Sequence, residues 1–406
     1  MKNLYKTALS VIAAAAAAVS LCAGASAYAG EDIYRVKGFD DNEIALAELF
    51  KSTLESFIEE EVDISKYNVT YDEFEDIYTT VLMNEPELYY VNVVQASLRY
   101  RSDEHILGFK PIYNCAYGEL ESRDKKIEKF SRSVMKGIGK NWSDEEKVLY
   151  VHDRLAAHIT YYDGGESEFG RNIYDAFAKS SSVCVGYALG FQYFMDKLDI
   201  PCINVTTDDH IWNMVEIDGQ WYHVDVTWDD SVEITKNTFM HQMILQSDES
   251  MAREELDHDL SKNAETADDS FFENAFWTES NTRISYLGGY WYYTNKEGLN
   301  RYSFNSGESK LIYNISGIWH AGEDMDWKIP FSQTAVYGKS IYFNSPTVIY
   351  RYDTTKNKIY KVYAPKLGKN EQIYDIYISD GKLVYSAGTY DDNARIKKAV
   401  RLNKAS

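Results

Sequence analysis

A cysteine, a histidine and an aspartate in the middle of the chain have the types and the order of a thiol acyl-transfer site. Cys184 lies at the start of a predicted helix, and His210 and then Asp225 follow it along the chain. In such a site the histidine takes the proton of the thiol, and the aspartate fixes the tautomer of the histidine and stabilises the imidazolium. The pattern predicts Cys184 as nucleophile, His210 as general base and Asp225 as the orienting carboxylate.

The sequence KSSSVCVGYALGFQYFMDKLDIP predicts the helix that positions the cysteine. Serines 180 to 182 are candidate caps, Pro201 excludes continuation, and apolar residues recur at helical spacing at Cys184, Ala188, Phe191, Met195 and Leu198. One interpretation is that Cys184 is a small hydrophobic residue on a buried stripe. The other is that the free N–H groups and the dipole of the first turn lower its pKa.

In that second interpretation the backbone N–H of Cys184 is one oxyanion donor. A second donor is not identified by the pattern, and the candidates by position alone are Trp142, Tyr162 and Asn172.

The stretch HIWNMVEIDGQWYHVDVTWDD predicts a hairpin that carries the other two residues. Asp218-Gly219 is a strong signal for a two-residue turn, because both central positions of that turn need positive φ. The register that follows puts His210 and Asp225 on one face as diagonal neighbours, with Cα atoms roughly 7–8 Å apart. A loop one residue longer would separate them onto opposite faces.

Several alternatives remain open at this site. A buried Asp225 could form a structural pair with His210 or be held by backbone N–H groups. His223, on the same predicted face, could be the base instead. A zinc site from Cys184, His210 and His223 is a further alternative, although no close-spaced ligand pair supports it. We expect no cofactor and no metal, and we expect His152 and His158, on a predicted helix from about Asp144 to His158, to be structural.

These segments resemble the transglutaminase-like superfamily, specifically its exported bacterial members. The resemblance rests on VCVGYALGFQYFMDKLDIPC, on the hairpin stretch above and on the preceding DEEKVLYVHDRLAAHITYY, and it covers roughly Leu120 to Ser231. It implies a papain-like α/β fold with Cys184, His210 and Asp225 in the roles given above. The superfamily contains cross-linking enzymes, peptidases and members without catalysis, so the resemblance does not determine the reaction.

The N-terminus predicts an exported protein. Lys2 and Lys6 precede an apolar, alanine-rich run, and small-residue cleavage sites follow, which indicates a signal peptide at residues 1–29. A lipid anchor through Cys22 is the alternative. We expect the mature protein to be secreted or at the cell surface, with no membrane span. Of the three cysteines left after cleavage, Cys115 and Cys202 could form a disulfide and leave Cys184 free.

Charge and sequence pattern divide the rest of the 406-residue chain into segments and disfavour one class of partner. The formal net charge of −21 disfavours nucleic acid. We expect a mainly helical segment at 30–115, a catalytic domain at 116–246, an acidic linker or helix at 247–269 and a β-rich aromatic domain at 270–406. The fold class expected is therefore α+β, with a papain-like or transglutaminase-like core between the helical segment and the β-rich domain.

The β-rich domain has internal repetition. Gly289, Gly338 and Gly381 each precede an aromatic strand, at spacings close to the period of a propeller blade. Three such units are too few to close a propeller, so a partial, propeller-like domain is expected. Its aromatic side chains are expected mainly in the core, although a peptide or glycan surface is an alternative.

Three functions agree with these patterns. The first is a secreted thiol hydrolase of peptide or isopeptide bonds, which we favour because water is always available outside the cell. The second is a transglutaminase that joins a glutamine side chain to an amine. The third is a non-catalytic extracellular binding protein. The expected partner is a protein or peptide substrate, such as a cell-wall or surface polypeptide.

Overall fold

The computed structural model describes residues 31–162, 169–207, 209–230, 238–253, 258–263, 265–320, 326–327, 332–389 and 396–401. The expected signal peptide and Cys22 lie outside these residues. The chain has the α+β composition expected, with helices and many antiparallel sheets.

Two compact units make up the chain, and each is assembled from separate segments. The first contains Met1–Val151, Tyr161–Val224 and Ser247–Asp269, and the second contains His152–Thr160, Asp225–Gln246 and Ser270–Ser406. The units thus interleave along the chain.

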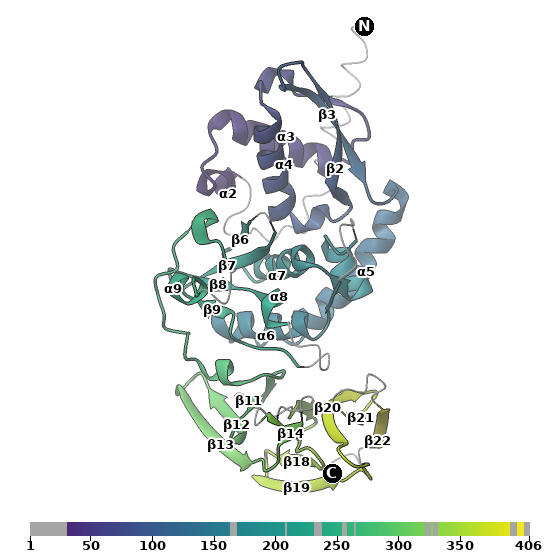
Figure 1. Ribbon diagram of the computed structural model, residues 1–406, viewed down its shortest axis with the longest axis vertical. Helices are drawn as coiled ribbons and strands as arrows, with labels where there is room; N and C mark the ends of the chain where they lie inside the picture. The colour runs from purple at the N-terminus through teal and green to yellow at the C-terminus, as the bar shows by residue number, and fades with distance from the viewer. Residues whose placement is uncertain are drawn as a thin grey trace. The chain divides into compact units, whose positions relative to one another are not determined.

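The first unit combines helices with small sheets (Figure 1). Its helices are α2 (Glu31–Val36), α3 (Asp41–Glu55), α4 (Tyr71–Asn84), α5 (Leu120–Met135), α7 (Cys184–Lys197) and α9 (Asp248–Met251), and α6 (Asp144–Ala156) begins in it. Its strands are β1 (Val62–Asp63), β2 (Val91–Tyr100), β3 (Ile106–Tyr113), β5 (Ser181–Ser182), β6 (Cys202–Thr206), β7 (Ile211–Ile217) and β8 (Gln220–Val224), and β4 (Thr160–Tyr161) ends in it.

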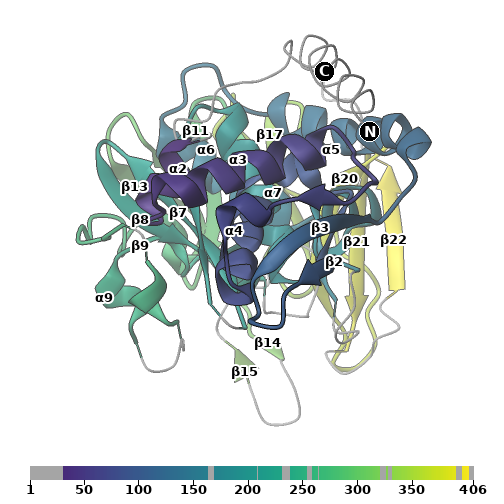
Figure 2. The ribbon, with the colours of Figure 1, turned by 90° about the horizontal axis from the view of Figure 1, so that it is seen from above.

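Local sequence signals explain where α3 and α4 begin. Asp40 with Glu43, and Thr70 with Glu73, form capping boxes that satisfy free N–H groups of the first turns. Both helices bury an apolar face, and Phe50, Phe74 and Tyr78 from these helices surround Phe109 of β3. Figure 2 shows α3 and α4 close to β2 and β3.

The hairpin of β7 and β8 has the predicted turn and register. Asp218 has φ +51° and Gly219 has φ +78°, and Ile217 pairs with Gln220. The same register continues to Asn213 opposite Val224. The hairpin was expected to include Asp225, but β8 ends at Val224 and the chain enters the short helix α8 (Val226–Asp229).

Helix α7 packs on β6 and β7 through buried amides as well as apolar side chains. Asn213 Nδ2 of β7 donates to the Ala188 carbonyl of α7 at 3.1 Å, and Asn204 Nδ2 of β6 donates to Gln192 Oε1 at 2.6 Å. Both asparagines are buried, and a buried amide without partners would be costly. These bonds therefore fix the helix that carries Cys184 on the strand that follows His210.

The second unit is mainly β-structure. It contains the end of α6, then α8, β9 (Ile244–Gln246) and a series of antiparallel sheets. The strands are β10 (Ser285–Leu287), β11 (Tyr290–Asn295), β12 (Gly298–Ser303) and β13 (Glu308–Asn314); β14 (Trp319–His320) and β15 (Asp326–Trp327); β16 (Thr334–Tyr337), β17 (Ser340–Asn344), β18 (Ile349–Asp353) and β19 (Lys358–Tyr363); and β20 (Gln372–Ser379), β21 (Lys382–Gly388) and β22 (Ile396–Arg401).

The three repeated glycines occupy equivalent turns in this unit. Gly289, Gly338 and Gly381 all have positive φ and lie in the first hairpin turn of the sheets that begin with β10, β16 and β20. One buried cluster contains Tyr292, Ile341 and Tyr374, and a second contains Tyr342, Ile376 and Tyr385. Many of the aromatic side chains are therefore core residues, as expected.

Candidate active site

Cys184 is the first residue of α7 and is partly buried. The residue before it, Val183, is the N-cap, and no side chain in the described part of the chain caps the helix. The expected serine caps are absent because Ser181 and Ser182 form β5 instead. The thiol thus lies at the N-terminal, positive end of the α7 helix dipole.

The segment before Cys184 is held by a buried network. Gly170 N donates to Asp175 Oδ2 at 2.8 Å, Val183 N donates to the Gly170 carbonyl at 3.1 Å, and the Ser182 hydroxyl also donates to this carbonyl. Gly170 has φ +83°, a conformation that favours glycine. These contacts fix the start of α7 through the backbone on its N-terminal side.

Gly186 is required by the same network. A Cβ atom at this position would collide with Ser182 Oγ and would lie 3.1 Å from the Asn172 carbonyl oxygen. Glycine therefore lets the first turn of α7 pack directly against the segment that leads into Cys184.

The three candidates for the second oxyanion donor make different contacts. The Asn172 amide is used locally, because its Nδ2 donates to Asp175 Oδ2 at 3.3 Å and its Oδ1 accepts from Asp175 N at 3.0 Å. Tyr162 N donates to the Ser182 carbonyl at 2.8 Å, and its ring contacts Phe169. The Trp142 ring contacts Tyr150. None of the three is placed as an oxyanion donor by these contacts.

His210 is partly buried immediately before β7, and its backbone is fixed by Thr207. Thr207 N donates to the His210 carbonyl at 2.9 Å, and His210 N donates to Thr207 Oγ1 at 3.1 Å. The His210 ring stacks on Trp212 with centroids 5.7 Å apart and planes 19° apart. Cys184 and His210 belong to the same unit: Cys184 begins α7, which packs against β7, and His210 immediately precedes β7.

The Trp212 indole is hydrogen-bonded to His223, which in turn contacts Asp248. The buried indole Nε1 donates to His223 Nδ1 at 3.0 Å, and His223 Nε2 lies 2.7 Å from Asp248 Oδ1. This bond with His223 lowers the pKa of the Asp248 carboxyl. Because both ring nitrogens of His223 are engaged, this residue is neither a free base nor an available zinc ligand. His223 thus contacts Trp212, the residue on which the His210 ring stacks.

His258 also lies at this site, although no pattern in the sequence indicated it. Its ring centroid is 5.6 Å from that of His210 and 4.8 Å from that of Trp212. The segment 247–269, expected as an acidic linker or helix, brings it there through contacts within the first unit. Asp248 N donates to the Ala267 carbonyl at 2.8 Å, and the Tyr222 hydroxyl donates to Asp269 Oδ2 at 2.5 Å.

Asp225 is buried and caps α8 in the second unit. Its Oδ1 accepts from Trp228 N at 3.0 Å, its backbone N donates to the Met243 carbonyl at 2.9 Å, and its carbonyl accepts from Asp229 N at 3.3 Å. The chain passes from the first unit to the second between Val224 and Asp225, so the pairing of His210 with Asp225 stays a prediction. The backbone N–H bond to the carboxylate corresponds to the structural alternative for this residue.

A second group of ionisable residues is fully buried in the second unit. His152 Nδ1 lies 3.3 Å from Asp153 Oδ1, and His152 Nε2 lies 3.1 Å from Asp229 Oδ2 without the alignment of a hydrogen bond. His241 Nε2 lies 2.9 Å from Asp153 Oδ1. Burial opposes the charged form of His152, but the two carboxylates prevail and raise its pKa to about 9.

In this buried group the imidazoles and carboxylates lie close together and shift the pKa values of His152 and Asp153. Burial would raise the pKa of Asp153, but the two imidazoles lower it to about 2. Among the described residues, His152, Asp153 and His241 have ligand atoms within 4.8 Å of one another, as a metal site needs. Both Asp153 oxygens are already engaged, since Ile284 N donates to Oδ2 at 2.7 Å. We therefore interpret the group as structural, as expected for His152, and assign it no metal.

The other two thiols do not form the disulfide that the sequence allowed. Cys115 and Cys202 are both free, and burial raises the pKa of each thiol. Cys202 is fully buried on β6, so its side chain acts as a small hydrophobic residue.

No protein-family model matches the chain, and no curated protein matches it. Among solved structures, it is similar to the crystal structure of a TGase, with 18% identity and a TM-score of 0.24 over 33% of this chain and 44% of that one. It is also similar to a putative cysteine protease from Cytophaga hutchinsonii, with 16% identity and a TM-score of 0.21 over 33% of this chain and 61% of that one. Menin is similar at 13% identity, with a TM-score of 0.23 over 47% of this chain and 36% of that one.

Each of these similarities spans less than two thirds of the known structure. With TM-scores this low they carry no argument about the reaction, which must rest on the residues of the site. In the described part of the chain, no helix has the length and apolar character needed to cross a membrane.

Proposed function

We propose that the chain is a secreted, thiol-dependent acyl-transfer enzyme that hydrolyses peptide or isopeptide bonds. Cys184 is the nucleophile, His210 the general base and Asp225 the orienting carboxylate. The observation that carries the proposal is the position of Cys184 at the uncapped start of α7, on a helix fixed by buried amides to the strand that follows His210. In this proposal the core is transglutaminase-like and the three glycine-turn sheets form a partial, propeller-like domain.

The proposed reaction has two steps. His210 takes the proton from the Cys184 thiol, and the thiolate attacks the substrate carbonyl to form a tetrahedral intermediate. The backbone N–H of Cys184 stabilises the oxyanion, and the intermediate collapses to a thioester while His210 gives the proton to the leaving amine. Water then attacks the thioester, His210 takes a proton from it, and the acid and the free thiol are released.

Two parts of the site support a base at His210. The stack on Trp212 and the Thr207 turn restrict the ring and its backbone. The bonds from Trp212 to His223 and from His223 to Asp248 fix that platform in turn. A base held in one orientation loses less entropy when it meets the thiol.

Hydrolysis and cross-linking share the thioester and differ in what resolves it. We test the proposal with glutamine-containing and isopeptide-containing peptides, in the presence and absence of a fluorescent primary amine. Hydrolysis predicts release of ammonia or a new amine, without incorporation of the label. Incorporation of the label would instead assign the protein as a transglutaminase.

Two cysteine variants test whether turnover depends on the Cys184 thiol in particular. Cys184→Ala is expected to abolish turnover, whereas Cys115→Ala, which removes a free thiol outside the site, is expected to retain it. Turnover that survives in Cys184→Ala would contradict the proposal.

A further inference from the structure

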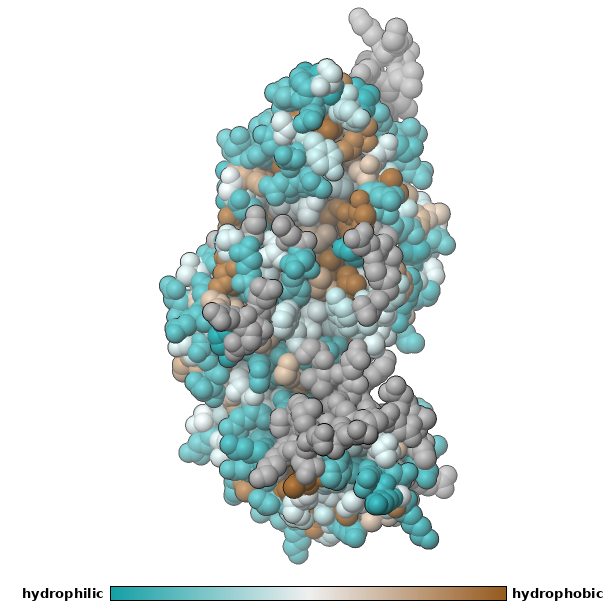
Figure 3. Space-filling view, viewed as in Figure 1, coloured by the Kyte–Doolittle hydropathy of each residue, from teal (hydrophilic) through white to brown (hydrophobic). Residues whose placement is uncertain are grey.

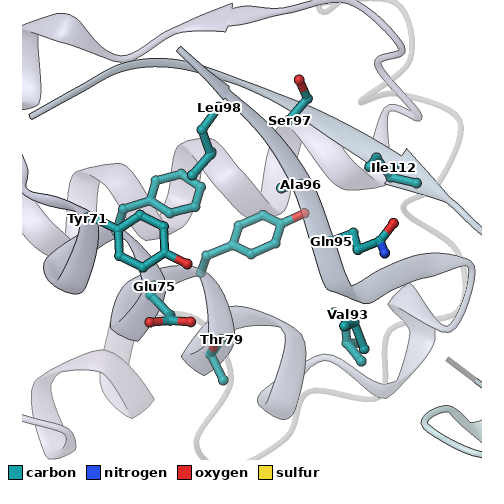
Figure 4. Close-up of a pocket in the computed structure, with 12 residues that line it drawn as sticks. Tyr71, Glu75, Thr79, Val93, Gln95, Ala96, Ser97, Leu98 and Ile112 are labelled. Carbon is teal, nitrogen blue, oxygen red and sulfur yellow. The ribbon is translucent and has the colours of Figure 1, made fainter. Parts of the chain in front are cut away.

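We propose that a cavity between α4 and β2 is a binding site for an extended, basic polypeptide segment. The cavity has a volume of about 450 Å³, a size common for ligand sites. It lies wholly within the first unit and is lined by residues of α4, β2 and β3, which Figure 4 shows around it. The inference does not depend on the proposed chemistry of Cys184.

The cavity exists because β2 leaves its partner strand. Val91 pairs with Tyr113 and Ala96 pairs with Pro111, so four residues of β2 lie opposite Ile112 alone. The Asn92 side chain holds this irregular stretch, since its Oδ1 accepts from Val94 N at 3.0 Å and from Gln95 N at 2.8 Å. The strand therefore arches away and uncovers Ile112, which lines the cavity.

The backbone of β2 lines the cavity together with its side chains. Successive side chains of a strand point to opposite faces, yet all six residues from 93 to 98 line the cavity. In the sheet that the structure describes, β2 is at the edge, with the order β1-β3-β2. An edge strand beside a pocket is the arrangement that binds an extended peptide by backbone hydrogen bonds and side-chain insertion.

The α4 wall supplies groups that point to the kind of ligand. Tyr71, Glu75 and Thr79 recur at helical spacing and lie on the helix side of the cavity (Figure 4). Tyr78 also lines it and is 6% exposed, and its hydroxyl has no hydrogen-bond partner among the described residues. A buried hydroxyl without a partner is costly, so a ligand amide that bonds to it is favoured.

Charge and hydrophobicity give the composition of the segment. Glu75 is the single charged residue in the lining, and the chain as a whole carries a net charge of −21. Phe74, Val94 and Leu98 line the cavity too, and Val94 is 58% exposed. Figure 3 shows hydrophobic side chains exposed among hydrophilic ones on the face that carries α4 and β2. The site thus fits an apolar side chain flanked by lysine or arginine.

The test measures binding of a fluorescein-labelled peptide, Gly-Lys-Phe-Lys-Val-Lys, to the full chain by fluorescence anisotropy. The matched control peptide has glutamate in place of each lysine and is expected to bind at least tenfold more weakly. Glu75→Gln and Tyr78→Phe are each expected to weaken binding by roughly threefold to tenfold, the range for one polar contact. Asp72→Asn, which neutralises an exposed residue outside the lining, is expected to leave binding unchanged.

A second readout locates the peptide. Hydrogen exchange in residues 91–100 should slow when the lysine peptide is bound, because edge amides become hydrogen-bonded. The same binding is expected in Cys184→Ala, so a failure here is distinct from a failure of the proposed reaction. Equal binding of the two peptides, or unchanged binding in both Glu75→Gln and Tyr78→Phe, would overturn the proposal.

Discussion

Raising the pH should destabilise the second unit through one buried histidine. His152 is fully buried between two carboxylates, and its pKa is raised to about 9 from the ordinary value of 6.5. A raised pKa means that the protonated form stabilises the fold below about pH 6.5, and that this contribution is lost as the pH rises toward about 9. One pKa unit corresponds to about 1.4 kcal/mol, so the loss over this window is about 3 kcal/mol.

The assay is urea denaturation of the full chain at pH 6, 7.5 and 9, followed by tryptophan fluorescence and circular dichroism. Because the chain has two units, the transition that depends on His152 is identified by the variant His152→Gln. That variant should be less stable at pH 6, since it removes the cation that lies against Asp153 and Asp229, and its stability should change much less up to pH 9. His320→Gln, an exposed histidine of the same unit, is the control and should behave as the wild type.

At acid pH the stability contributed by the same network changes with pH in the opposite direction. The pKa of Asp153 is lowered to about 2, so its contribution is present above about pH 4 and is lost as the pH falls through about 2.

A wild-type free energy of unfolding that stays constant within about 1 kcal/mol from pH 6.5 to 9 would refute the assignment of a protonated His152.

Three further substitutions test how the site is built. Gly186→Ala should cost about 1–3 kcal/mol in thermal or chemical denaturation, because the added Cβ collides with Ser182 Oγ, and a wild-type stability would contradict the close packing. Asn213→Leu should cost about 1–3 kcal/mol by the same assay, because it removes the donor to the Ala188 carbonyl, and a neutral effect would show that water replaces it. His223→Phe should lower the reactivity of Cys184 toward iodoacetamide severalfold while the chain stays folded by circular dichroism, and unchanged reactivity would show that Trp212 needs no such support.

The sequence predicted the elements that depend on neighbouring residues. The Asp218-Gly219 turn and the register of β7 and β8 follow from a two-residue loop that needs positive φ. The start of α7 near Cys184 and the turns at the repeated glycines depend on equally local signals. Serines were expected to cap α7, but Ser181 and Ser182 form strand β5 instead. The strand pairing thus outweighed the local capping preference.

The parts that were missed depend on residues far apart in the chain. Asp153 meets His241 across 88 residues, and His223 meets Asp248 across 25, so neither pair leaves a local pattern. The charge of the segment 247–269 indicated a solvated linker, yet His258 from this segment lies against Trp212. The cavity beside β2 likewise depends on the pairing of β2 with β3, which no single segment specifies.

The most direct test of the proposed function is the rate of iodoacetamide alkylation at Cys184 against pH, in the wild type and in His210→Ala. Cys115 and Cys202, whose thiol pKa values are raised by burial, are internal controls in the same digest. His258→Ala tests whether the neighbouring ring, rather than His210, activates the thiol. The proposal predicts fast labelling of Cys184 near pH 6 that is lost in His210→Ala and retained in His258→Ala. Labelling that rises only above about pH 8.5, the value of an unperturbed thiol, and is the same in His210→Ala would contradict it.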